Sequence, residues 1–230
     1  MKNLRRKDDA KRRLLRAGER LFAEQGIHRV RIRELHELAG QRNTSALHYH
    51  FRNRNGLVDA IIAEHWTEID AAIQSRLDAI SLDGDPDVRQ VLTAVVPAIA
   101  AKLLDESGRR YLRIVPQLLP QLSKNFRAGR FVPATSQATR VLELLRRGMS
   151  HQSEEIQRER LVAYALILVT LLADRAEGLD RGRDMVLDHE TFVANLIDVL
   201  TGALAHPEGR RTSRAIRPRP SRQSRARSQR

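Results

Sequence analysis

Apolar residues recur every three and four positions along most of the chain, and this spacing permits little besides α-helix. The clearest early set would share one helical face: Leu14, Ala17, Gly18, Leu21 and Phe22. No convincing run of alternating β-branched residues, the pattern of a half-buried strand, is found in the sequence. We therefore expect an all-α fold.

Glycine and asparagine mark the expected helix ends in the first part of the chain. Gly26 and Gly40 suit C-terminal caps, because glycine adopts a left-handed backbone without strain. Between them a helix over about 31–39 would turn inward Ile32, Leu35, Leu38 and Ala39. A shorter helix over about 44–50 follows, and Asn53 could cap a longer one that buries Leu57, Ile61, Ile62 and Ile69. Closely spaced helices with a tight turn at Gly40 predict a helix-turn-helix unit.

The remainder of the chain also has helical periodicity. Past the turn "SLDGDPD", helices are expected at about 86–106, 109–122, 136–150, 153–176 and 188–205. Pro97 and Pro116 should kink or break their helices. Irregular helices of this kind often wall a cavity, although a packing adjustment explains them as well. Residues 207–230 form an Arg-rich tail with almost no large apolar side chain, and we expect it to be disordered.

Charge is distributed unevenly along the chain, whose formal net charge is +13. Residues 1–58 hold 15 Lys and Arg against 6 Asp and Glu, and residues 209–230 hold nine Arg and no acid, so each segment carries +9. The stretch 59–208 carries −5. Basic ends around an acidic middle favour a polyanionic partner such as nucleic acid, although basic faces are often merely solvated.

Several classes of protein do not fit the sequence. Cysteine is absent, which excludes disulfides, thiolate metal sites and cysteine nucleophiles. No nucleophile elbow, phosphate-binding loop or H-E-x-x-H pattern occurs, and His48 and His50 are spaced poorly for a shared metal ion. The charged N-terminal stretch lacks the apolar core of a secretory signal, and the apolar run "YALILVTLLA" is too short to span a bilayer. We expect a cytoplasmic protein that is not an enzyme and needs no cofactor or metal.

The segment "AGQRNTSALHYHF" (39–51) is a poor core element but suits a helix that reads DNA. Such a helix must present hydrogen-bonding groups to base edges and phosphates. Ala46, Leu47 and Phe51 would face the core, which leaves the polar side chains outward: Thr44, Ser45, His48 and Tyr49. Arginines flank the helix at positions 42, 52 and 54. For Tyr49 and His50 packing between helices is an alternative role.

The stretch "RRLLRAGERLFAEQGIHRVRIRELHELAGQRNTSALHYHFRNRNGL" resembles the DNA-binding domain of the TetR family of bacterial transcriptional regulators. The resemblance covers roughly residues 10–65 and rests on "GERLFAEQG", "RELHELAG", "SALHYHF" and "RNRNGL". It implies phosphate contacts by Tyr49 and Arg54, and base-edge contacts by Thr44, Ser45 and His48. The full set expected to contact DNA is Arg31, Arg42, Asn43, Thr44, Ser45, His48, Tyr49, Arg52 and Arg54.

The sequence departs from the family pattern in several places. Val30 and Arg31 stand where a hydroxyl usually caps the second helix, and loss of that cap costs about 1 kcal/mol unless another group replaces it. The turn "GQRN" is one residue longer than the common form. His48 stands where the family often has tyrosine, so either His48 or Tyr49 could fill that role. Gly56 weakens the expected start of the fourth helix.

The resemblance divides the chain into a basic arm (1–9), the DNA-binding domain (10–65), a helical ligand-binding and dimerisation domain (66–206) and the tail (207–230). A long helix would join the two domains. The apolar late helices predict a homodimer interface through Leu161, Tyr164, Leu168, Leu172, Leu196, Val199 and Leu200, although helices central to a single monomer would show the same pattern. A pocket for a small-molecule inducer is expected among Lys102, Tyr111, Ile114, Val115, Gln117 and Gln121. The low aromatic content favours an aliphatic inducer.

Two functions remain open from sequence. The first is a ligand-responsive homodimeric repressor that binds a palindromic double-stranded DNA operator. The alternative is a non-specific nucleic-acid-binding or architectural protein, in which the arginine-rich tail dominates through phosphate neutralisation. Neither function involves a membrane.

Overall fold

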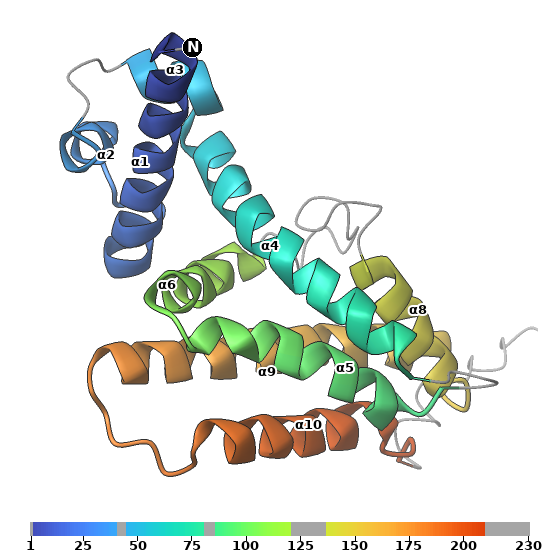
Figure 1. The fold of residues 1–230 in the computed structure, drawn as a ribbon. Coiled ribbons are helices and arrows are strands. Elements are labelled where there is room, and N and C mark those ends of the chain that lie inside the picture. The colour runs from blue at the N-terminus through green and yellow to red at the C-terminus, as the bar shows by residue number, and fades with distance from the viewer. Residues whose placement is uncertain (1, 41–44, 81–85, 121–136, 210–230) are drawn as a thin grey trace, which may run out of the picture.

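The computed structural model describes residues 2–40, 45–80, 86–120 and 137–209, and within these ranges the chain is helical with no β-strand (Figure 1). This confirms the all-α prediction. A head made of the first helices stands at one end of the molecule (Figure 1). The remaining helices form a larger body, and one long helix belongs to both (Figure 1).

The head consists of α1 (Lys2–Gln25), α2 (Ile32–Leu38), α3 (Ser45–Phe51) and the first turns of α4 (Arg54–Asp78). The predicted inward face of α1 is confirmed, since Leu14 and Phe22 are fully buried. α1 begins at Lys2, so the segment predicted as a separate arm, 1–9, belongs almost entirely to this helix. α4 then continues from the head into the body, where Ile69, Ile73 and Leu77 are buried.

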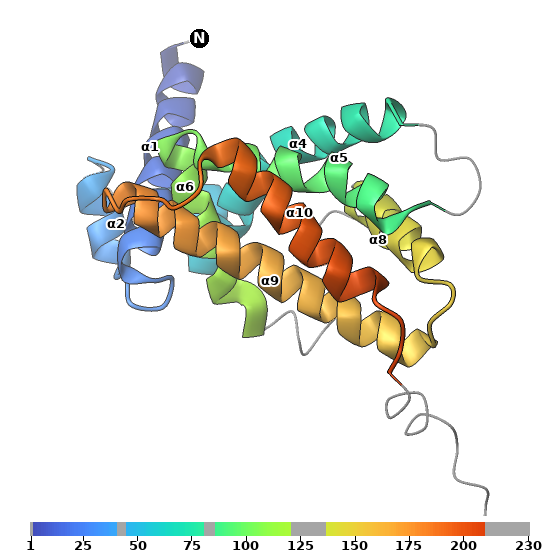
Figure 2. The ribbon, with the colours of Figure 1, turned by 90° about the horizontal axis from the view of Figure 1, so that it is seen from below.

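The body contains α5 (Val88–Ala100), the 3₁₀ turn η1 (Ala101–Leu103), α6 (Glu106–Ile114), the 3₁₀ turn η2 (Val115–Leu118), α8 (Gln137–Gly148), α9 (Glu154–Asp180) and α10 (His189–Ala205). α9 and α10 lie side by side at one surface (Figures 1 and 2). α10 packs on α5 and α9, whereas α6 packs on both α9 and α1. No helix within the described ranges is long and apolar enough to cross a membrane.

Several helix boundaries in the body differ from the sequence-based expectation. The helix predicted over 86–106 ends at Ala100, and the Asp105 carboxylate caps α6 by accepting a hydrogen bond of 2.7 Å from the Gly108 amide. Pro97 does not break α5, which continues past it to Ala100. At Pro116 the backbone tightens into η2, because proline has no amide hydrogen for the α-helical ladder.

The caps of the head largely follow the sequence prediction. Gly26 and Gly40 adopt positive φ angles of 93° and 62°, as expected for left-handed C-terminal positions. No side chain replaces the missing hydroxyl cap of α2, but the Glu34 carboxylate accepts the Arg31 amide at 2.7 Å and so satisfies the backbone where the helix begins. The Asn53 carboxamide oxygen accepts the Gly56 amide at 3.0 Å, so the predicted cap of α4 is confirmed.

The inward face of α2 differs from the prediction. Leu35 and Ala39 are buried as expected, but Ile32 and Leu38 are 46% and 45% exposed. His36 occupies the core position instead, with only 2% of its surface exposed. A helix of seven residues has room for one narrow buried stripe, and here that stripe runs through Leu35, His36 and Ala39. Neither ring nitrogen of His36 finds a hydrogen-bond partner among the described residues.

We expect His36→Leu to stabilise the protein by about 1 kcal/mol. The substitution removes buried polar atoms that lack partners and keeps an apolar side chain in the same space. Urea unfolding at neutral pH measures the free-energy change. His28→Leu, at an exposed position of the same head, is the matched control and should change stability little. Destabilisation by His36→Leu alone would show that the imidazole makes a favourable polar interaction in solution.

Candidate DNA-binding surface and internal cavity

α3 presents one apolar face to the head and one polar face to solvent. Leu47 and Phe51 are 3% and 6% exposed and pack against α1 and α4. His48 and Tyr49 lie on the outer side, and Tyr49 is 67% exposed. Ser45 is the first residue of α3. The polar side of this short helix is therefore available to an external partner.

His48 is held in one orientation by the backbone that follows α3. Its Nδ1 atom lies 2.8 Å from the Arg52 carbonyl oxygen, so Nδ1 carries the hydrogen and donates. In the neutral ring this leaves Nε2 as an acceptor. Arg52 has a φ angle of 66°, a left-handed conformation that turns the chain from α3 into α4. Tyr49 and His50 make an edge-to-face ring contact with a centroid distance of 4.9 Å.

The junction between α3 and α4 requires glycine at position 56. A Cβ atom there would lie 1.9 Å from the Phe51 carbonyl oxygen, which no side chain can tolerate. Gly56, which in the sequence suggested only a weak helix start, allows the two helices to meet closely. The Arg54 guanidinium turns inward and donates to the Val30 carbonyl oxygen at 2.6 Å. Arg54 therefore ties α4 to the segment before α2.

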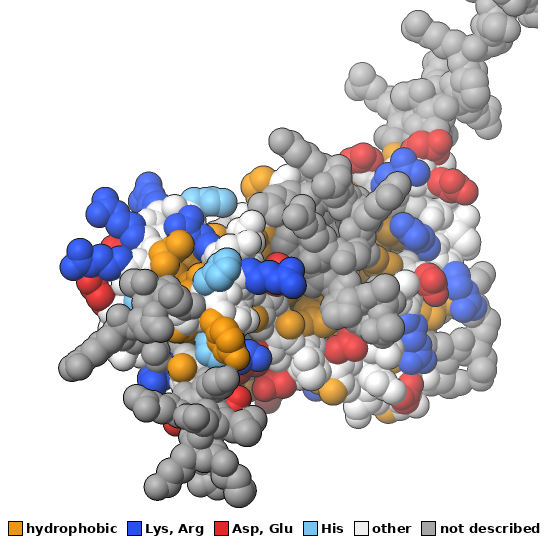
Figure 3. Space-filling view, turned by 90° about the horizontal axis from the view of Figure 1, so that it is seen from above, with side chains coloured by type: hydrophobic (Ala, Val, Ile, Leu, Met, Phe, Trp, Pro, Cys, Tyr) orange, Lys and Arg blue, Asp and Glu red, His pale blue; other side chains and the backbone are white. Residues whose placement is uncertain are grey.

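Other residues expected to contact DNA are placed less completely. Arg31 is exposed at the N-terminus of α2, and Arg52 is exposed after α3. Arg42, Asn43 and Thr44 lie outside the described residues. Figure 3 views this end of the molecule from above, and Lys and Arg side chains gather over the part of the head where α2 lies. The surface beside α3 is thus flanked by positive charge.

A buried carboxylate joins the head to the body. Glu19 on α1 is 1% exposed and accepts hydrogen bonds from His65 Nε2 on α4 and Ser107 Oγ on α6, each at 2.6 Å. Arg16 donates to Glu19 at 2.9 Å and also pairs with Glu64. The His65 ring stacks on Tyr111 with a centroid distance of 4.6 Å. Side chains from three helices therefore converge on one acid.

The pKa of Glu19 reflects two opposing effects. Burial alone would raise the pKa of this carboxyl group, because the charged form loses hydration. The hydrogen bonds from His65, Ser107 and Arg16, together with the charge of Arg16, outweigh burial and hold the pKa below its ordinary value of 4.5. The carboxylate is thus ionised whenever its unfolded counterpart is.

A second joint lies at the C-terminal end of α1. The Gln117 side-chain oxygen accepts the Ile27 amide at 2.7 Å, and its nitrogen donates to the Phe22 carbonyl at 3.0 Å. The same nitrogen donates to the Arg113 carbonyl at 3.1 Å. Gln117 thereby binds the end of α1 to η2. Sequence reasoning placed Gln117 in the pocket, but its polar atoms are used for this contact between head and body.

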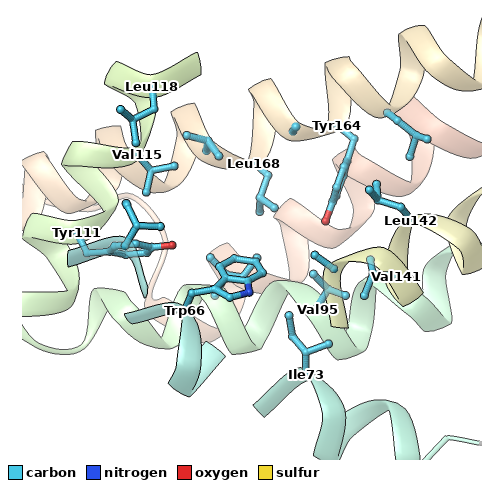
Figure 4. Close-up of a pocket in the computed structure, with 16 residues that line it drawn as sticks. Trp66, Ile73, Val95, Tyr111, Val115, Leu118, Val141, Leu142, Tyr164 and Leu168 are labelled. Carbon is cyan, nitrogen blue, oxygen red and sulfur yellow. The ribbon is translucent and has the colours of Figure 1, made fainter. Parts of the chain in front are cut away.

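An apolar cavity of about 210 Å³ lies in the body, between α4, α5, α6, η2, α8 and α9 (Figure 4). Every described residue that lines it is apolar or aromatic: Ile62, Trp66, Ile73, Val95, Ile99, Tyr111, Val115, Leu118, Ala138, Val141, Leu142, Leu161, Tyr164, Ala165, Leu168 and Val169. A cavity of roughly 150 Å³ is enough to admit benzene. This space can therefore hold a small organic molecule.

Two of the six residues predicted for the pocket, Tyr111 and Val115, line the cavity. Ile114 is fully buried in the core, and Lys102 is buried in an ion pair with Glu68. Gln121 lies outside the described residues. Trp66, the only tryptophan in the sequence, was not predicted, because the apolar periodicity of α4 does not distinguish a cavity wall from ordinary core.

Most residues predicted for the dimer interface are buried within the protomer. Among the seven, only Val199 has a large exposed fraction, 43%, and three others line the cavity: Leu161, Tyr164 and Leu168. Leu172, Leu196 and Leu200 are buried core residues. The outer surface of α9 and α10 is formed by other side chains, among which Leu166 is 41% exposed.

Comparison with known proteins finds a family model that matches the head and solved structures with a similar fold. Residues 14–61 match the family model of bacterial regulatory proteins of the tetR family. Among solved structures, NalD, the secondary repressor of the MexAB-OprM multidrug efflux pump in Pseudomonas aeruginosa, has a TM-score of 0.57 at 18% identity, covering 88% of this chain and 100% of NalD. The fatty acid degradation regulator FadR from Bacillus halodurans has a TM-score of 0.53 at 16% identity, covering 86% of this chain and 97% of FadR. No curated protein matches the sequence.

The depressed pKa of Glu19 predicts a pH-dependent stability difference between wild type and Glu19→Gln. Ionised Glu19 stabilises the fold at pH values above about 4.5, its ordinary pKa, and this contribution is lost as the pH falls through the lower folded-state pKa. The gap in melting temperature should therefore be largest near neutral pH and shrink in acid. Glu24→Gln, in an exposed pair with Arg20, is the control and should show little difference at any pH. A constant gap for Glu19→Gln would contradict the assignment.

Proposed function

We propose that this chain, a member of the tetR family of bacterial regulatory proteins by its N-terminal domain, is a homodimeric transcriptional repressor. In this proposal two α3 helices bind an inverted-repeat operator, and a small molecule in the cavity releases the DNA. The observation that carries the proposal is the position of the cavity. Its walls include α4 and η2, the elements that also hold the head.

The DNA contact is assigned to the exposed side of α3 and its flanks. Tyr49 on α3 is 67% exposed, and the orientation of His48 is fixed by its bond to the Arg52 carbonyl. A helix placed in the major groove needs such preoriented donors and acceptors. Arg31 and Arg52 supply positive charge for phosphates. Arg54 supports this surface through Val30 and so positions the reading helix.

The second copy is assigned to the outer surface of α9 and α10. These helices lie side by side, and each carries an exposed apolar residue, Leu166 on α9 and Val199 on α10. Exposed apolar groups on adjacent helices favour a partner of the same kind across a two-fold axis. A two-fold dimer would set the distance between its two α3 helices, and an operator would match that distance.

The ligand response is assigned to the elements shared by cavity and head. On α4, His65 bonds to Glu19 while its neighbour Trp66 lines the cavity. On η2, Val115 and Leu118 line the cavity on either side of Gln117, which binds the end of α1. A molecule that favours a different spacing of these walls would therefore favour a different position of the head. The most that such a molecule can change the affinity for DNA is the ratio of its own affinities for the two positions of the head.

Selection from random DNA duplexes tests the proposed function. The protein should be used as the full chain and as a chain ending after Gly209, which keeps the Glu208 carboxylate on the Ser153 amide. Both should enrich the same inverted repeat. Tyr49→Ala should weaken binding to that repeat by about tenfold or more, as expected for loss of one phosphate contact and its packing. Leu104→Ala, at a similarly exposed position on the body, should leave binding unchanged.

The alternative function predicts a different result from the same selection. If the shortened chain enriches no sequence while the full chain binds all duplexes with a steep dependence on salt, the arginine-rich tail drives binding. The protein is then a non-specific nucleic-acid-binding protein. The nine arginines of residues 209–230 are the observation that keeps this alternative in view.

The dimer assignment predicts that Leu166→Glu separates the two copies. A charge placed in an apolar interface loses its hydration without a counterion, so association should weaken strongly. Analytical ultracentrifugation should give twice the single-chain mass of 26.2 kDa for the wild type and a shift towards that single-chain mass for the variant. Val186→Glu, at a residue that is 99% exposed between α9 and α10, is the matched control. Equal masses for Leu166→Glu and wild type would place the interface elsewhere.

A further inference from the structure

The lining of the cavity defines the chemistry of the molecule that it can hold. No charged, amide or carboxyl side chain belongs to the described part of the lining. Two buried charged groups of the described chain already have partners on the protein, since Glu19 binds His65 and Lys102 binds Glu68. An ionised ligand would lose its hydration on entering this space and would find no counterion among the described lining residues. The described lining therefore disfavours both carboxylates and amines.

Polar atoms in the lining come from aromatic side chains. Trp66 Nε1 is buried and has no hydrogen-bond partner among the described residues. An indole N–H can only donate, so its missing partner is an acceptor. Burial of such a group without a partner costs about 1–3 kcal/mol, which a ligand oxygen would recover.

Two tyrosines add hydroxyl groups to the same space. Figure 4 shows the phenolic oxygens of Tyr111 and Tyr164 pointing into the cavity on either side of Trp66. Burial raises the pKa of both phenols above the ordinary value of 10.0, so both stay protonated and can donate. The donors are thus few, neutral and surrounded by hydrocarbon.

We infer that the ligand is an uncharged, mainly hydrocarbon molecule that carries an oxygen acceptor for the Trp66 indole. This rests on the proposed function only in treating the cavity as the regulatory site. Esters, ketones and lactones of medium size have this chemistry. Free fatty acids and cationic drugs do not. The cavity volume of about 210 Å³ exceeds the roughly 150 Å³ of a cavity that admits benzene, so the ligand can be larger than benzene.

A matched set of probes tests this class. Methyl octanoate is an uncharged ester, and its isomer nonanoic acid is present at neutral pH as the charged nonanoate. Undecane is a hydrocarbon with the same number of non-hydrogen atoms. Trp66 is the only tryptophan in the sequence and lines the cavity, so its fluorescence reports binding directly. Methyl octanoate should bind at least tenfold more tightly than nonanoate. It should also bind more tightly than undecane.

Substitutions then locate the hydrogen bond. Trp66→Phe removes the N–H donor and the fluorescence, so binding to this variant is followed by the shift in melting temperature that saturating probe produces. The variant should lose about fivefold to tenfold in affinity for methyl octanoate, the effect of one hydrogen bond, and little for undecane. Leu104→Ala, at an exposed residue of the body that does not line the cavity, should leave both affinities unchanged.

The probe measurements test the ligand class, and the release of DNA tests the proposed ligand response. Tighter binding of nonanoate than of methyl octanoate, equal loss of ester and hydrocarbon affinity in Trp66→Phe, or no binding of any probe would each overturn the inferred ligand class. Binding of methyl octanoate with the predicted pattern supports the class whether or not the operator is released. Release is measured separately, on the selected DNA, and its absence would count only against the proposed ligand response.

Discussion

The arrangement of head and body depends on one buried carboxylate. Among the buried residues of the described chain, Glu19 is the only acid. Removing this charge from water is unfavourable by several kcal/mol unless its oxygens are saturated with donors. Saturation requires Arg16 on its own helix, His65 on α4 and Ser107 on α6 to meet at distances of 2.6–2.9 Å. Few relative positions of these helices satisfy all three bonds, so the acid fixes the angle at which the head stands.

The joint and the cavity differ in the kind of interaction that holds them together. Hydrogen bonds at Glu19 and Gln117 are directional and fail over a few tenths of an ångström, whereas apolar contacts around the cavity are not directional. Walls of the second kind can separate slightly around a ligand at small cost. The hydrogen bonds at Glu19 and Gln117 would break under the same displacement. In the proposed regulator, movement of the cavity walls would therefore move α1 as well. His65 connects the two regions because its ring stacks on Tyr111, a cavity residue, while Nε2 holds Glu19.

The sequence predicted features that are encoded locally. Spacing and capping residues identified the helices of the head, the Asn53 cap and the inward face of α3, because each depends on neighbours within one or two turns. The roles of Arg54 and Gln117 depend on backbone carbonyls far away in the sequence and could not be read from spacing. The late helices show the same limit. Leu161, Tyr164 and Leu168 were predicted to meet a second copy, since an apolar stripe does not reveal whether it faces a partner, the core or a cavity.

The charge distribution of the chain and its uncharged cavity would affect DNA binding in different ways. Residues 1–58 carry +9 and residues 59–208 carry −5, so apart from the basic tail the field of DNA attracts the head and repels the body. This orientation does not depend on the cavity, whose described lining contains no charge. An uncharged ligand would leave the attraction to phosphate intact and could weaken binding only through the distance between the heads. Because phosphate contacts tolerate many positions and base contacts tolerate few, such a ligand would reduce affinity for the operator far more than affinity for other DNA. In the proposed regulator, a ligand in the apolar cavity would therefore control specific binding, while the basic head would keep the protein on DNA.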